Sequence, residues 1–372
     1  MLSENKYLID TVIIKVVAPC NLNCTYCYEY NMGDDSWKKK PKRISRETLI
    51  TVRDRIQKYI NHNNLNSFAV TLHGGEPLML SEIILEEYLS ILSKINVKKL
   101  QIGIQTNATL ANLNKIQILN KYNVNIGVSI DGNENANKFR VDLKGKQAHK
   151  RIVEGVELIK KHAKYFSGFL SVVNLNAEPD EVLDFLAKYN PAQIDFLQPF
   201  ANYSNPPIIL DTKYNYGDWM VKAFNHWNKK KNLSKIRIRY FEDALFSILN
   251  NESRSDWFGI KPPGYILIST DGSYEGLDTI KVASEDARIT NKNALDSDIV
   301  DVAASDILKI RKTGLSQLPD DCKKCEIKRW CSGGYFPTRY SLEKGYNNKS
   351  YYCADLKIFF NHLNNWIQTE HK

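Results

Sequence analysis

The cysteines of this chain of 372 residues fall into two groups near opposite ends of the sequence, and none lies between the groups. In order along the chain, they are Cys20, Cys24 and Cys27, then Cys322, Cys325, Cys331 and Cys353. Clustered cysteines in a chain without a secretion signal indicate metal binding or catalysis rather than a disulfide framework. The spacing therefore predicts two metal centres.

The first group has the pattern CxxxCxxC and closely follows an apolar run that ends at Val17. Three thiolates can bind three irons of a 4Fe–4S cube, which ordinarily has four thiolate ligands. The fourth iron then stays open for a substrate or cofactor. Zinc is the alternative, but zinc sites use four protein ligands, or three and a water, and no histidine lies nearby.

The elements that must position these residues follow an alternating pattern. Short β-type runs alternate with segments of helical period between residues 11 and 200, which predicts repeated βα units and a parallel sheet. The predicted strands are Val12–Val17, Phe68–Leu72, Leu100–Ile104, Val124–Ile130, Phe169–Asn174 and Ile194–Leu197. The fold class is α/β, a partial (β/α)6 barrel, in which loops at the C-terminal ends of the strands carry the reactive groups.

The remainder of the chain has a different pattern. Lys213–Leu249 predicts two helices, a strand pair follows at Tyr265–Ser269 and Tyr274–Leu277, and a final helix lies near Asp355–Trp366. Weak periodicity combined with four cysteines suggests a C-terminal region organised around metal. The predicted domains are a barrel over 1–210, a helical connecting region over 211–255 and a cysteine-rich auxiliary-cluster domain over 256–372.

Composition and charge exclude several classes. The chain is 43% hydrophobic and 25% charged, which is typical of a globular protein. The formal net charge is +9, and the basic residues are scattered along the sequence except in Lys38–Arg43 and Lys229–Lys231. Because no stretch of basic residues is interleaved with aromatic residues, nucleic acid is not expected as a partner. Met1–Val17 fits neither a signal peptide nor a membrane span. We therefore expect a cytoplasmic protein.

The cysteine loop, with Tyr26 just before its third cysteine, resembles the radical S-adenosylmethionine (radical SAM) superfamily. A second resemblance is to the GGEP motif of that family, formed by Gly74, Gly75, Glu76 and Pro77. The resemblance implies that the open iron chelates S-adenosylmethionine, whose reductive cleavage gives a 5′-deoxyadenosyl radical that abstracts hydrogen from a substrate. It also implies that the glycines let the backbone approach a ligand and that Glu76 accepts a hydrogen bond from the methionyl ammonium.

Further cofactor contacts are implied by polar residues near the ends of later strands. The resemblance places polar groups against the cofactor and pairs Arg140 with its carboxylate. The implied contacts are Thr106, Asn107, Ser129, Asp131, Arg140 and Asn174, with Leu197 as an apolar wall for adenine. Each alone would be an ordinary surface or core residue, so the order of the set is what favours binding.

The second cysteine group has the pattern CxxCx5C followed by Cys353. Four thiolates complete a cluster with no open site, which suits electron transfer or structure, and a zinc ribbon is the alternative. Beside the first motif, this pattern resembles the C-terminal SPASM-type domain of peptide-modifying members of the superfamily. The implied cofactors are two 4Fe–4S clusters and S-adenosylmethionine.

The chain departs from the full SPASM pattern, which has two auxiliary clusters. Tyr335 stands where a further cysteine is expected, and neither Phe258–Ile260 nor Gly276–Asp278 contains one. This implies that the inner cluster is lost, which disfavours thioether formation at a thiolate bound there. Asp278 stands where sulfatase-maturing relatives have an aspartate proposed as a base, so we predict it as a general base, with a plain turn residue as the alternative.

The segment Leu197–Pro207 resembles cyclophane-forming maturases more than the sulfatase group. The sequence therefore favours cross-linking of a ribosomal precursor peptide at an aromatic side chain. A formylglycine-forming anaerobic sulfatase maturase is the main alternative, followed by a thioether-forming maturase, a non-catalytic iron–sulfur protein and an RNA-modifying enzyme. The expected partners are the precursor peptide and an external electron donor such as flavodoxin or ferredoxin. Too few residues precede Cys20 for a leader-binding domain, so leader recognition is expected elsewhere.

Overall fold

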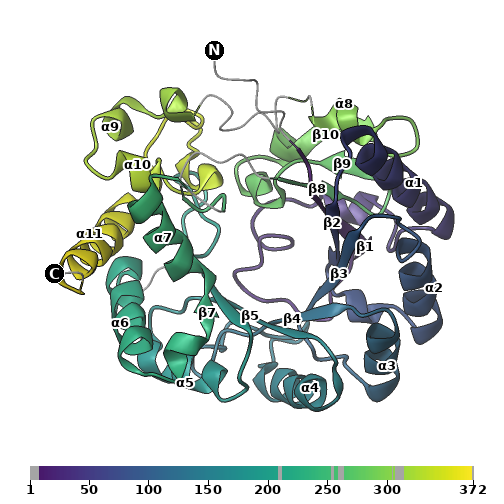
Figure 1. The fold of residues 1–372 in the computed structure, drawn as a ribbon, viewed down its shortest axis with the longest axis horizontal. Coiled ribbons are helices and arrows are strands. Elements are labelled where there is room, and N and C mark those ends of the chain that lie inside the picture. The colour runs from purple at the N-terminus through teal and green to yellow at the C-terminus, as the bar shows by residue number, and fades with distance from the viewer. Residues whose placement is uncertain are drawn as a thin grey trace. The chain divides into compact units, whose positions relative to one another are not determined.

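The computed structural model describes residues 8–207, 212–252, 255–258, 264–303, 305 and 314–370. The chain divides into two compact units, each assembled from three stretches of sequence (Figure 1). The first unit contains Met1–Ser129, Val141–Ser167 and Pro262–Ile310. The second unit contains Ile130–Arg140, Gly168–Lys261 and Arg311–Lys372.

The first unit is built on a mostly parallel sheet. Its strands are β1 (Thr11–Val17), β2 (Ser67–Gly74), β3 (Lys99–Thr106), β4 (Asn125–Ser129), β8 (Tyr265–Ile268), β9 (Ser273–Glu275) and β10 (Ile289–Asn293). They follow the order β10-β9-β8-β1-β2-β3-β4, in which β9 is antiparallel to both of its neighbours. Strand β1 is central and pairs in parallel with β2 and β8.

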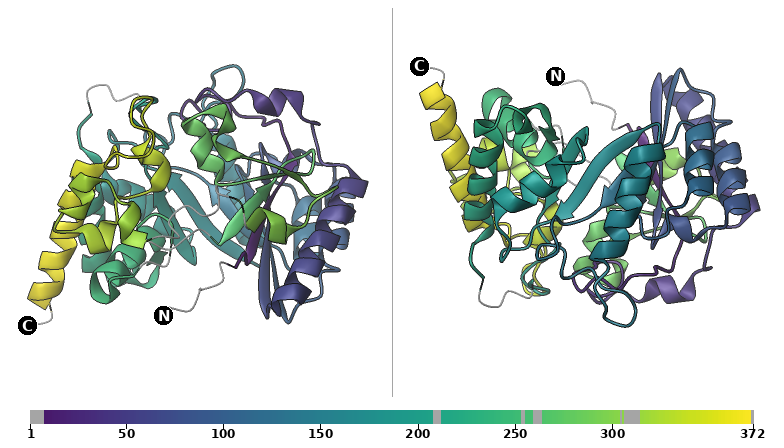
Figure 2. Two further views of the ribbon diagram at one scale, coloured as in Figure 1. Left: turned by 90° about the horizontal axis from the view of Figure 1, so that it is seen from above. Right: turned by 90° about the horizontal axis from the view of Figure 1, so that it is seen from below.

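Helices follow the parallel strands of the first unit. They are α1 (Arg46–Asn63), α2 (Glu82–Leu92), α3 (Leu113–Lys121), α4 (His149–His162) and α8 (Ile299–Ala303). Short 3-10 turns lie at η1 (Ser36–Lys39), η2 (Pro77–Met79), η4 (Asp278–Val282) and η5 (Glu285–Arg288). Figures 1 and 2 show α1, α2 and α3 side by side along one face of the strands, where their apolar stripes are buried.

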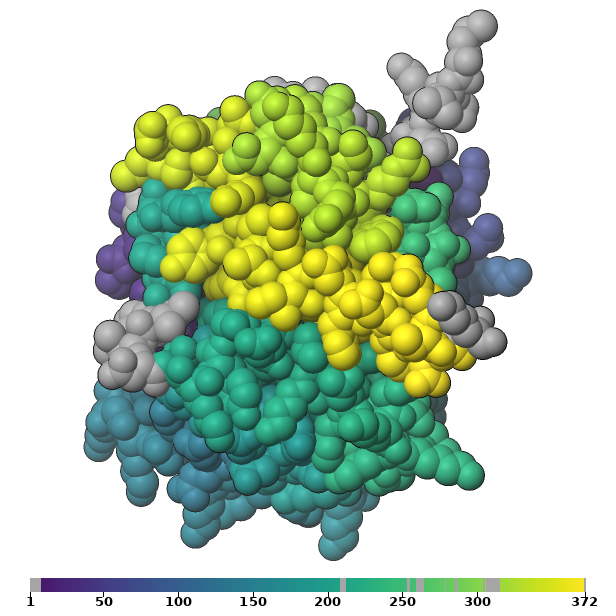
Figure 3. Space-filling model, turned by 90° about the vertical axis from the view of Figure 1, so that its left-hand side faces the viewer, coloured from purple at the N-terminus to yellow at the C-terminus, as the bar shows by residue number. Residues whose placement is uncertain are grey.

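The second unit contains β6 (Gln193–Leu197), which pairs in parallel with β7 (Arg237–Ile238) and with β5 (Phe166–Val172) from Gly168 onward. Its helices are α5 (Pro179–Ala187), α6 (Tyr216–Lys229), α7 (Arg239–Asn250), α9 (Asp320–Lys323), α10 (Lys328–Cys331) and α11 (Cys353–Glu370), with 3-10 turns η3 (Leu233–Lys235), η7 (Gly314–Gln317) and η8 (Phe336–Arg339). Helix α11 lies along α6 and α7 (Figure 3). No helix among the described residues is long and apolar enough to cross a membrane.

The six predicted barrel strands are all present within a few residues of their predicted ends. The strand pair is present as β8 and β9, each ending before its predicted last residue, and the chain turns between them at Gly272, whose φ is +82°. The final helix begins at Cys353 rather than near Asp355. The sequence pattern does not predict β7, β10, α9 or α10, which have at most five residues each and therefore too little periodicity. The predicted domain boundaries at 210 and 255 stay a prediction.

Candidate active site

The cysteine loop begins where β1 leaves the centre of the sheet. Successive backbone hydrogen bonds shape it, since the N–H of Cys27 donates to the carbonyl of Cys24 (2.9 Å) and that of Asn31 to the carbonyl of Cys27 (2.8 Å). The N–H of Asn23 donates to the carbonyl of Val141 (2.8 Å), which ties the loop to a second segment of the same unit. Backbone hydrogen bonds therefore fix the conformation of the loop that carries Cys20, Cys24 and Cys27.

The thiols of this loop lie close enough to influence one another electrostatically. Burial, together with the charges of Glu76, Cys24 and Cys27, raises the pKa of Cys20 to about 12. Burial also raises the pKa of Cys27 to about 12, with Cys24 as the next cause. Iron binding requires thiolates, so occupation of this site would release protons.

Hydrogen-bond donors surround the same sulfur atoms. The Sγ of Cys20 accepts from the N–H of Leu22 (3.4 Å) and from the side-chain amide of Asn107 (3.7 Å). Backbone N–H groups of Glu29 and Tyr30 lower the pKa of Cys27. Because hydrogen bonds to the sulfurs help to set the properties of iron–sulfur clusters, this donor set fits the predicted cluster.

The glycine pair after β2 packs against the cysteine loop. A Cβ on Gly74 would lie 2.0 Å from the carbonyl oxygen of Val17, and one on Gly75 would lie 2.0 Å from that of Pro19. The N–H of Gly75 donates to Val17 (3.0 Å) and that of Glu76 to Pro19 (3.2 Å). In the structure the two glycines thus allow the GGEP turn to approach the protein's own backbone closely. The sequence analysis had predicted close approach to a ligand instead.

Glu76 is 1% exposed and accepts three hydrogen bonds within the protein. Oε1 accepts from the N–H of Leu78 (2.9 Å) and the hydroxyl of Thr106 (2.6 Å), and Oε2 accepts from the N–H of Asn107 (2.7 Å). Burial raises the pKa of Glu76, and these bonds partly offset the effect. A carboxylate has about four acceptor positions, so one remains for the predicted ammonium contact.

Asn107 connects Glu76 to the cysteine loop. Its backbone binds Glu76, while its side-chain amide donates to Asn21 (3.0 Å) as well as to Cys20. Asn21 in turn donates to Thr109 (2.8 Å). The structure therefore brings together the cysteine loop, the GGEP turn and the end of β3 at one edge of the sheet.

The other predicted contacts of the first unit have the following positions. Ser129 ends β4, and its hydroxyl accepts from the side-chain amide of Gln105 (2.8 Å). Pro77 is buried at the first position of η2, and Tyr26 is half-buried within the cysteine loop. Whether these side chains contact the cofactor stays a prediction.

The remaining predicted contacts belong to the second unit. A guanidinium nitrogen of Arg140 lies 2.9 Å from Oδ1 of Asp131, and both side chains are buried. The side-chain amide of Asn174 donates to the carbonyls of Asn135 (3.1 Å) and Ala136 (3.3 Å). Leu197 is 6% exposed. Arg140, predicted to pair with the cofactor carboxylate, thus already has a protein carboxylate as a partner.

The second cysteine group lines one pocket of the second unit. The lining residues are Cys322, Cys325, Ile327, Lys328, Cys331, Gly333, Ser350 and Cys353. Cys331 ends α10 and Cys353 begins α11. Burial raises the pKa of Cys331 to about 12, and the buried guanidinium of Arg339 lowers it in part.

No three Cys, His, Asp or Glu side chains among the described residues converge on one point, as ligands of a single metal ion do. In a 4Fe–4S cube each thiolate binds a separate iron, so the ligands need only surround the cluster. Four thiols around one pocket, with a buried cation beside them, fit a group that carries net negative charge.

The structure describes part of the region where the sequence predicts that an inner cluster is lost. Tyr335 is 6% exposed and packs with Trp257 (4.7 Å between ring centroids) and Phe200 (5.8 Å). Aromatic packing therefore surrounds the position where the pattern has a cysteine. Residues 259 and 260 lie outside the described residues. Asp278 begins η4, and its side chain also lies outside the description.

Sequence reasoning missed several residues of the site. Asn21, Gln105 and Thr109 serve as hydrogen-bond partners of predicted residues, and their positions beside motif residues were the available signal. Lys15, which lies inside an apolar run of the sequence, was likewise not predicted as part of the site. In the structure that lysine is buried in β1 and pairs with Glu29.

The chain is similar to known proteins over most of its length. The model of the radical SAM superfamily matches residues 14–190. A cysteine-type anaerobic sulfatase-maturating enzyme of Clostridium perfringens is 28% identical over 358 residues, covering 92% of each chain. A serine-type anaerobic sulfatase-maturating enzyme of Bacteroides thetaiotaomicron is 25% identical, covering 95% of this chain and 89% of the relative.

A solved structure, native anSMEcpe with bound AdoMet, superposes with a TM-score of 0.80 and 25% identity. The superposition covers 96% of this chain and 98% of that chain. The α/β partial barrel with a cysteine-containing C-terminal region, predicted from the sequence, is the fold of that structure and is confirmed.

Proposed function

We propose that this chain, which matches the radical SAM superfamily over residues 14–190, is a radical SAM maturase that oxidises a serine or cysteine side chain of a sulfatase to formylglycine. The proposal rests on the similarity to a cysteine-type and a serine-type sulfatase-maturating enzyme, each over more than nine-tenths of this chain. This similarity supports the alternative that the sequence offered, rather than the favoured cross-linking function. The resemblance of Leu197–Pro207 to cross-linking maturases carries less weight because it covers a single segment.

The geometry of the first unit supports the chemistry of this proposal. Cys20, Cys24 and Cys27 would hold three irons of a cluster, and Glu76 would bind the ammonium of S-adenosylmethionine. When bound, the cluster and S-adenosylmethionine supply the radical that abstracts hydrogen, and an auxiliary cluster supplies an electron acceptor. The hydrogen bonds from Asn107 to both Cys20 and Glu76 fix the position of the cysteine loop relative to the carboxylate of Glu76.

The reaction removes one hydrogen atom, one proton and one electron from the side chain of the target residue. A serine CH2–OH becomes the aldehyde directly. A cysteine CH2–SH becomes a thioaldehyde, which water converts to the aldehyde with release of sulfide. We retain Asp278 as the proposed proton acceptor because its position resembles that of the aspartate proposed as a base in sulfatase-maturing enzymes. A flavodoxin or ferredoxin remains the proposed external electron donor.

The test uses anaerobically reconstituted protein, a reductant and S-adenosylmethionine. Three peptides with the sequence around a sulfatase target are compared, with Cys, Ser or Ala at the target position. We expect an aldehyde, detected by a hydrazide probe and located by fragmentation, from the Cys or Ser peptide and none from the Ala peptide. The protein with Cys20, Cys24 and Cys27 replaced by Ala is the matched control.

A different outcome would favour a different function. Cross-linked fragments of a precursor peptide, with no reaction of the hydrazide probe, would return the assignment to a cross-linking maturase. Formation of 5′-deoxyadenosine without modification of any target peptide would contradict the sulfatase assignment but not the radical SAM chemistry.

A further inference from the structure

Glu29 lies two residues after Cys27 and is 9% exposed, although it carries a charge. Two buried lysines bind its carboxylate. The Nζ of Lys15, on β1, lies 3.1 Å from both carboxylate oxygens, and Lys281, in η4, donates to Oε2. The Lys281 side chain is 0% exposed, and its Nζ also lies 5.1 Å from the ring centroid of Tyr28.

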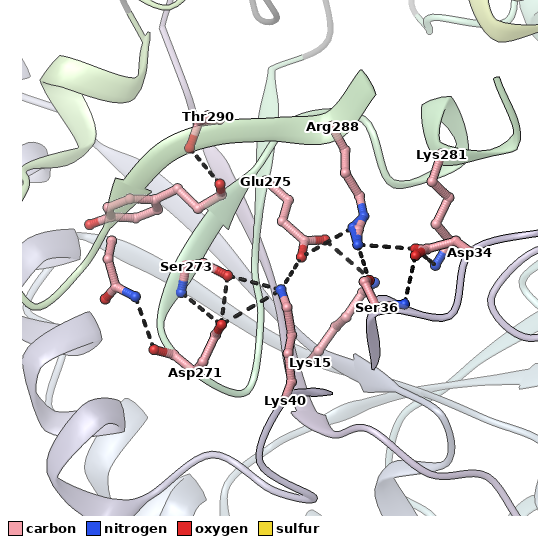
Figure 4. Close-up of polar contacts among 12 residues, drawn as sticks. Lys15, Asp34, Ser36, Lys40, Asp271, Ser273, Glu275, Lys281, Arg288 and Thr290 are labelled. Atoms are coloured by element: carbon pink, nitrogen blue, oxygen red, sulfur yellow. Dashed lines mark hydrogen bonds and ion pairs between the residues drawn. The ribbon is translucent and has the colours of Figure 1, made fainter. Parts of the chain in front are cut away.

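Further ion pairs extend from this centre, and Figure 4 shows them. Arg288 lies 3.0 Å from Asp34 and 3.5 Å from Glu275. Lys40 lies 2.5 Å from Glu275 and 3.7 Å from Asp271. We call this set the charge network, and its members are Lys15, Glu29, Asp34, Lys40, Asp271, Glu275, Lys281 and Arg288.

The charge network joins segments that are far apart in the sequence. Lys15 precedes the cysteine loop, Glu29 to Lys40 follow it, and the remaining members come from the β8–β10 region of the same unit. Among the side chains that the structure describes, these members comprise as many cations as carboxylates. Loss of Lys281 would leave the buried carboxylate of Glu29 with one lysine partner fewer.

Stability alone does not explain such a network. Desolvation of buried ion pairs consumes most of the attraction between the charges, and replacement by apolar residues is often neutral or stabilising. Removing one partner, however, is strongly destabilising because it leaves an uncompensated charge. The network is therefore suited to fixing the arrangement of segments and the local electrostatic potential.

Glu29 lies close enough to Cys27 for its charge to act on the thiol of that residue. Its carboxylate is one of the charges that act on the Cys27 thiol, and its backbone N–H is directed to the same residue. A cluster bound at Cys27 would therefore experience the charge of Glu29 and its compensation by lysine. Charge near an iron–sulfur cluster is one of the factors that set its reduction potential.

We propose that Lys15 and Lys281 are positioning residues, which hold the Glu29 carboxylate, fix the loop that carries Cys27 and neutralise a buried negative charge beside the radical SAM cluster. This proposal rests on the cluster-binding role of Cys20, Cys24 and Cys27 but not on the identity of the peptide substrate. The direction of the expected change in the reduction potential follows from electrostatics. Reduction adds negative charge to the cluster, so a Glu29 carboxylate that has lost one of its two lysine partners makes reduction harder and lowers the potential.

The experiment measures the midpoint potential of the reconstituted full chain without peptide, from the EPR signal that changes on addition of S-adenosylmethionine. Lys281→Met should shift this potential to a more negative value, whereas Lys281→Arg should keep it near that of the wild type. The double variant Glu29→Gln/Lys281→Met, which removes both charges, should return it toward the wild-type value. The iron content after gel filtration is measured in parallel, and we expect it to fall in Lys281→Met.

The matched control is Lys38→Met on the same segment. Lys38 is 57% exposed, and its Nζ lies 2.8 Å from a carboxylate oxygen of the exposed Asp35. It should change neither the potential nor the iron content. A Lys281→Met potential equal to that of the wild type would overturn the proposal, as would a double variant that remains as low as the single variant.

If Lys281→Met does not fold, as judged by circular dichroism, Glu29→Gln decides the question. That variant keeps both lysines and leaves their positive charge in excess, so its potential must rise, and an unchanged potential overturns the proposal. These measurements are independent of aldehyde formation. A chain that forms no aldehyde but shows the expected shifts would contradict the sulfatase function and support the charge network.

Discussion

Glu76 and the thiols of the cysteine loop share a buried environment in which negative charge is unfavourable. Burial raises the pKa of Glu76 and of Cys20, and the charge of Glu76 adds to the shift at Cys20. Cations stabilise the charged forms of such groups. Iron at the thiols and the ammonium of S-adenosylmethionine at Glu76 are therefore expected to bind in a way that depends on pH.

The first prediction concerns the pH dependence of cofactor binding at Glu76. Because burial raises its pKa above 4.5, the charged form that binds an ammonium is lost as the pH falls through that raised value. We expect the affinity of the wild type for S-adenosylmethionine to decrease from neutral to mildly acidic pH. Glu76→Gln should bind about tenfold to a hundredfold more weakly at neutral pH and with little pH dependence, as loss of a charge-assisted hydrogen bond implies.

Calorimetric titration of the reconstituted protein over this pH range checks the prediction. Glu82→Gln is the control, since Glu82 accepts hydrogen bonds from Asn112 and Asn114 at the surface. A Glu76→Gln profile that still follows that of the wild type would show that another group binds the ammonium.

Residue types and spacing predicted the motif residues but not their partners. The cysteine spacing and the GGEP motif are local patterns, so Cys20 and Glu76 could be found from the sequence. The bond from Asn107 to Cys20 joins residues that are 87 positions apart. No periodicity encodes such a contact, because it depends on the register of parallel strands. The pairing of Lys15 with Glu29 and Lys281 was missed for the same reason.

At the scale of elements, the turn after β2 and the loop after β1 form one packed assembly. The register places Val17, the last residue of β1, opposite Gly74, the last residue of β2. The cysteine loop and the GGEP turn therefore begin beside each other. Space for a side chain at Gly75 is absent, since a Cβ there would lie 2.0 Å from the Pro19 carbonyl oxygen and 2.2 Å from the Tyr30 hydroxyl. The backbone of the cysteine loop would have to move to admit one.

We therefore predict that Gly75→Ala displaces the cysteine loop. Overpacking of this kind typically costs about 1–3 kcal/mol, and the shifted thiols should retain less iron after reconstitution. Iron analysis and thermal unfolding provide the measurement. Gly103→Ala in β3 is the matched control, because its Cβ would have only ordinary contacts, the nearest at 3.5 Å. Equal iron content in the two variants would contradict the packing argument.

The long elements were predictable and the short ones were not. Helix α1 has 18 residues, a buried apolar stripe and the N-cap Ser45, all of which are local signals. Helix α10 has four residues and ends at Cys331, where Ser332 adopts a left-handed φ of 48°. Its course is determined by the cysteine pocket and by contacts with α7 and α11, which a single sequence does not reveal.

At the scale of the whole molecule, the two cysteine groups belong to different compact units. Cys20, Cys24 and Cys27 are in the first unit, and the four pocket cysteines are in the second. Each unit combines distant stretches of sequence. Since the ligands of each proposed cluster come from one unit alone, the two sites should assemble independently.

The last prediction is therefore the metal content of the chain and of two sets of variants. Two cubes correspond to about eight irons per chain, and replacing Cys20, Cys24 and Cys27 by Ala should leave about four of them. Replacing the four pocket cysteines by Ala should also leave about four, with the EPR response to S-adenosylmethionine retained. Elemental analysis after anaerobic reconstitution gives the counts. Zinc in the pocket of natively purified protein would make that site a zinc ribbon. About twelve irons in the wild type would show an inner cluster that the aromatic packing around Tyr335 argues against.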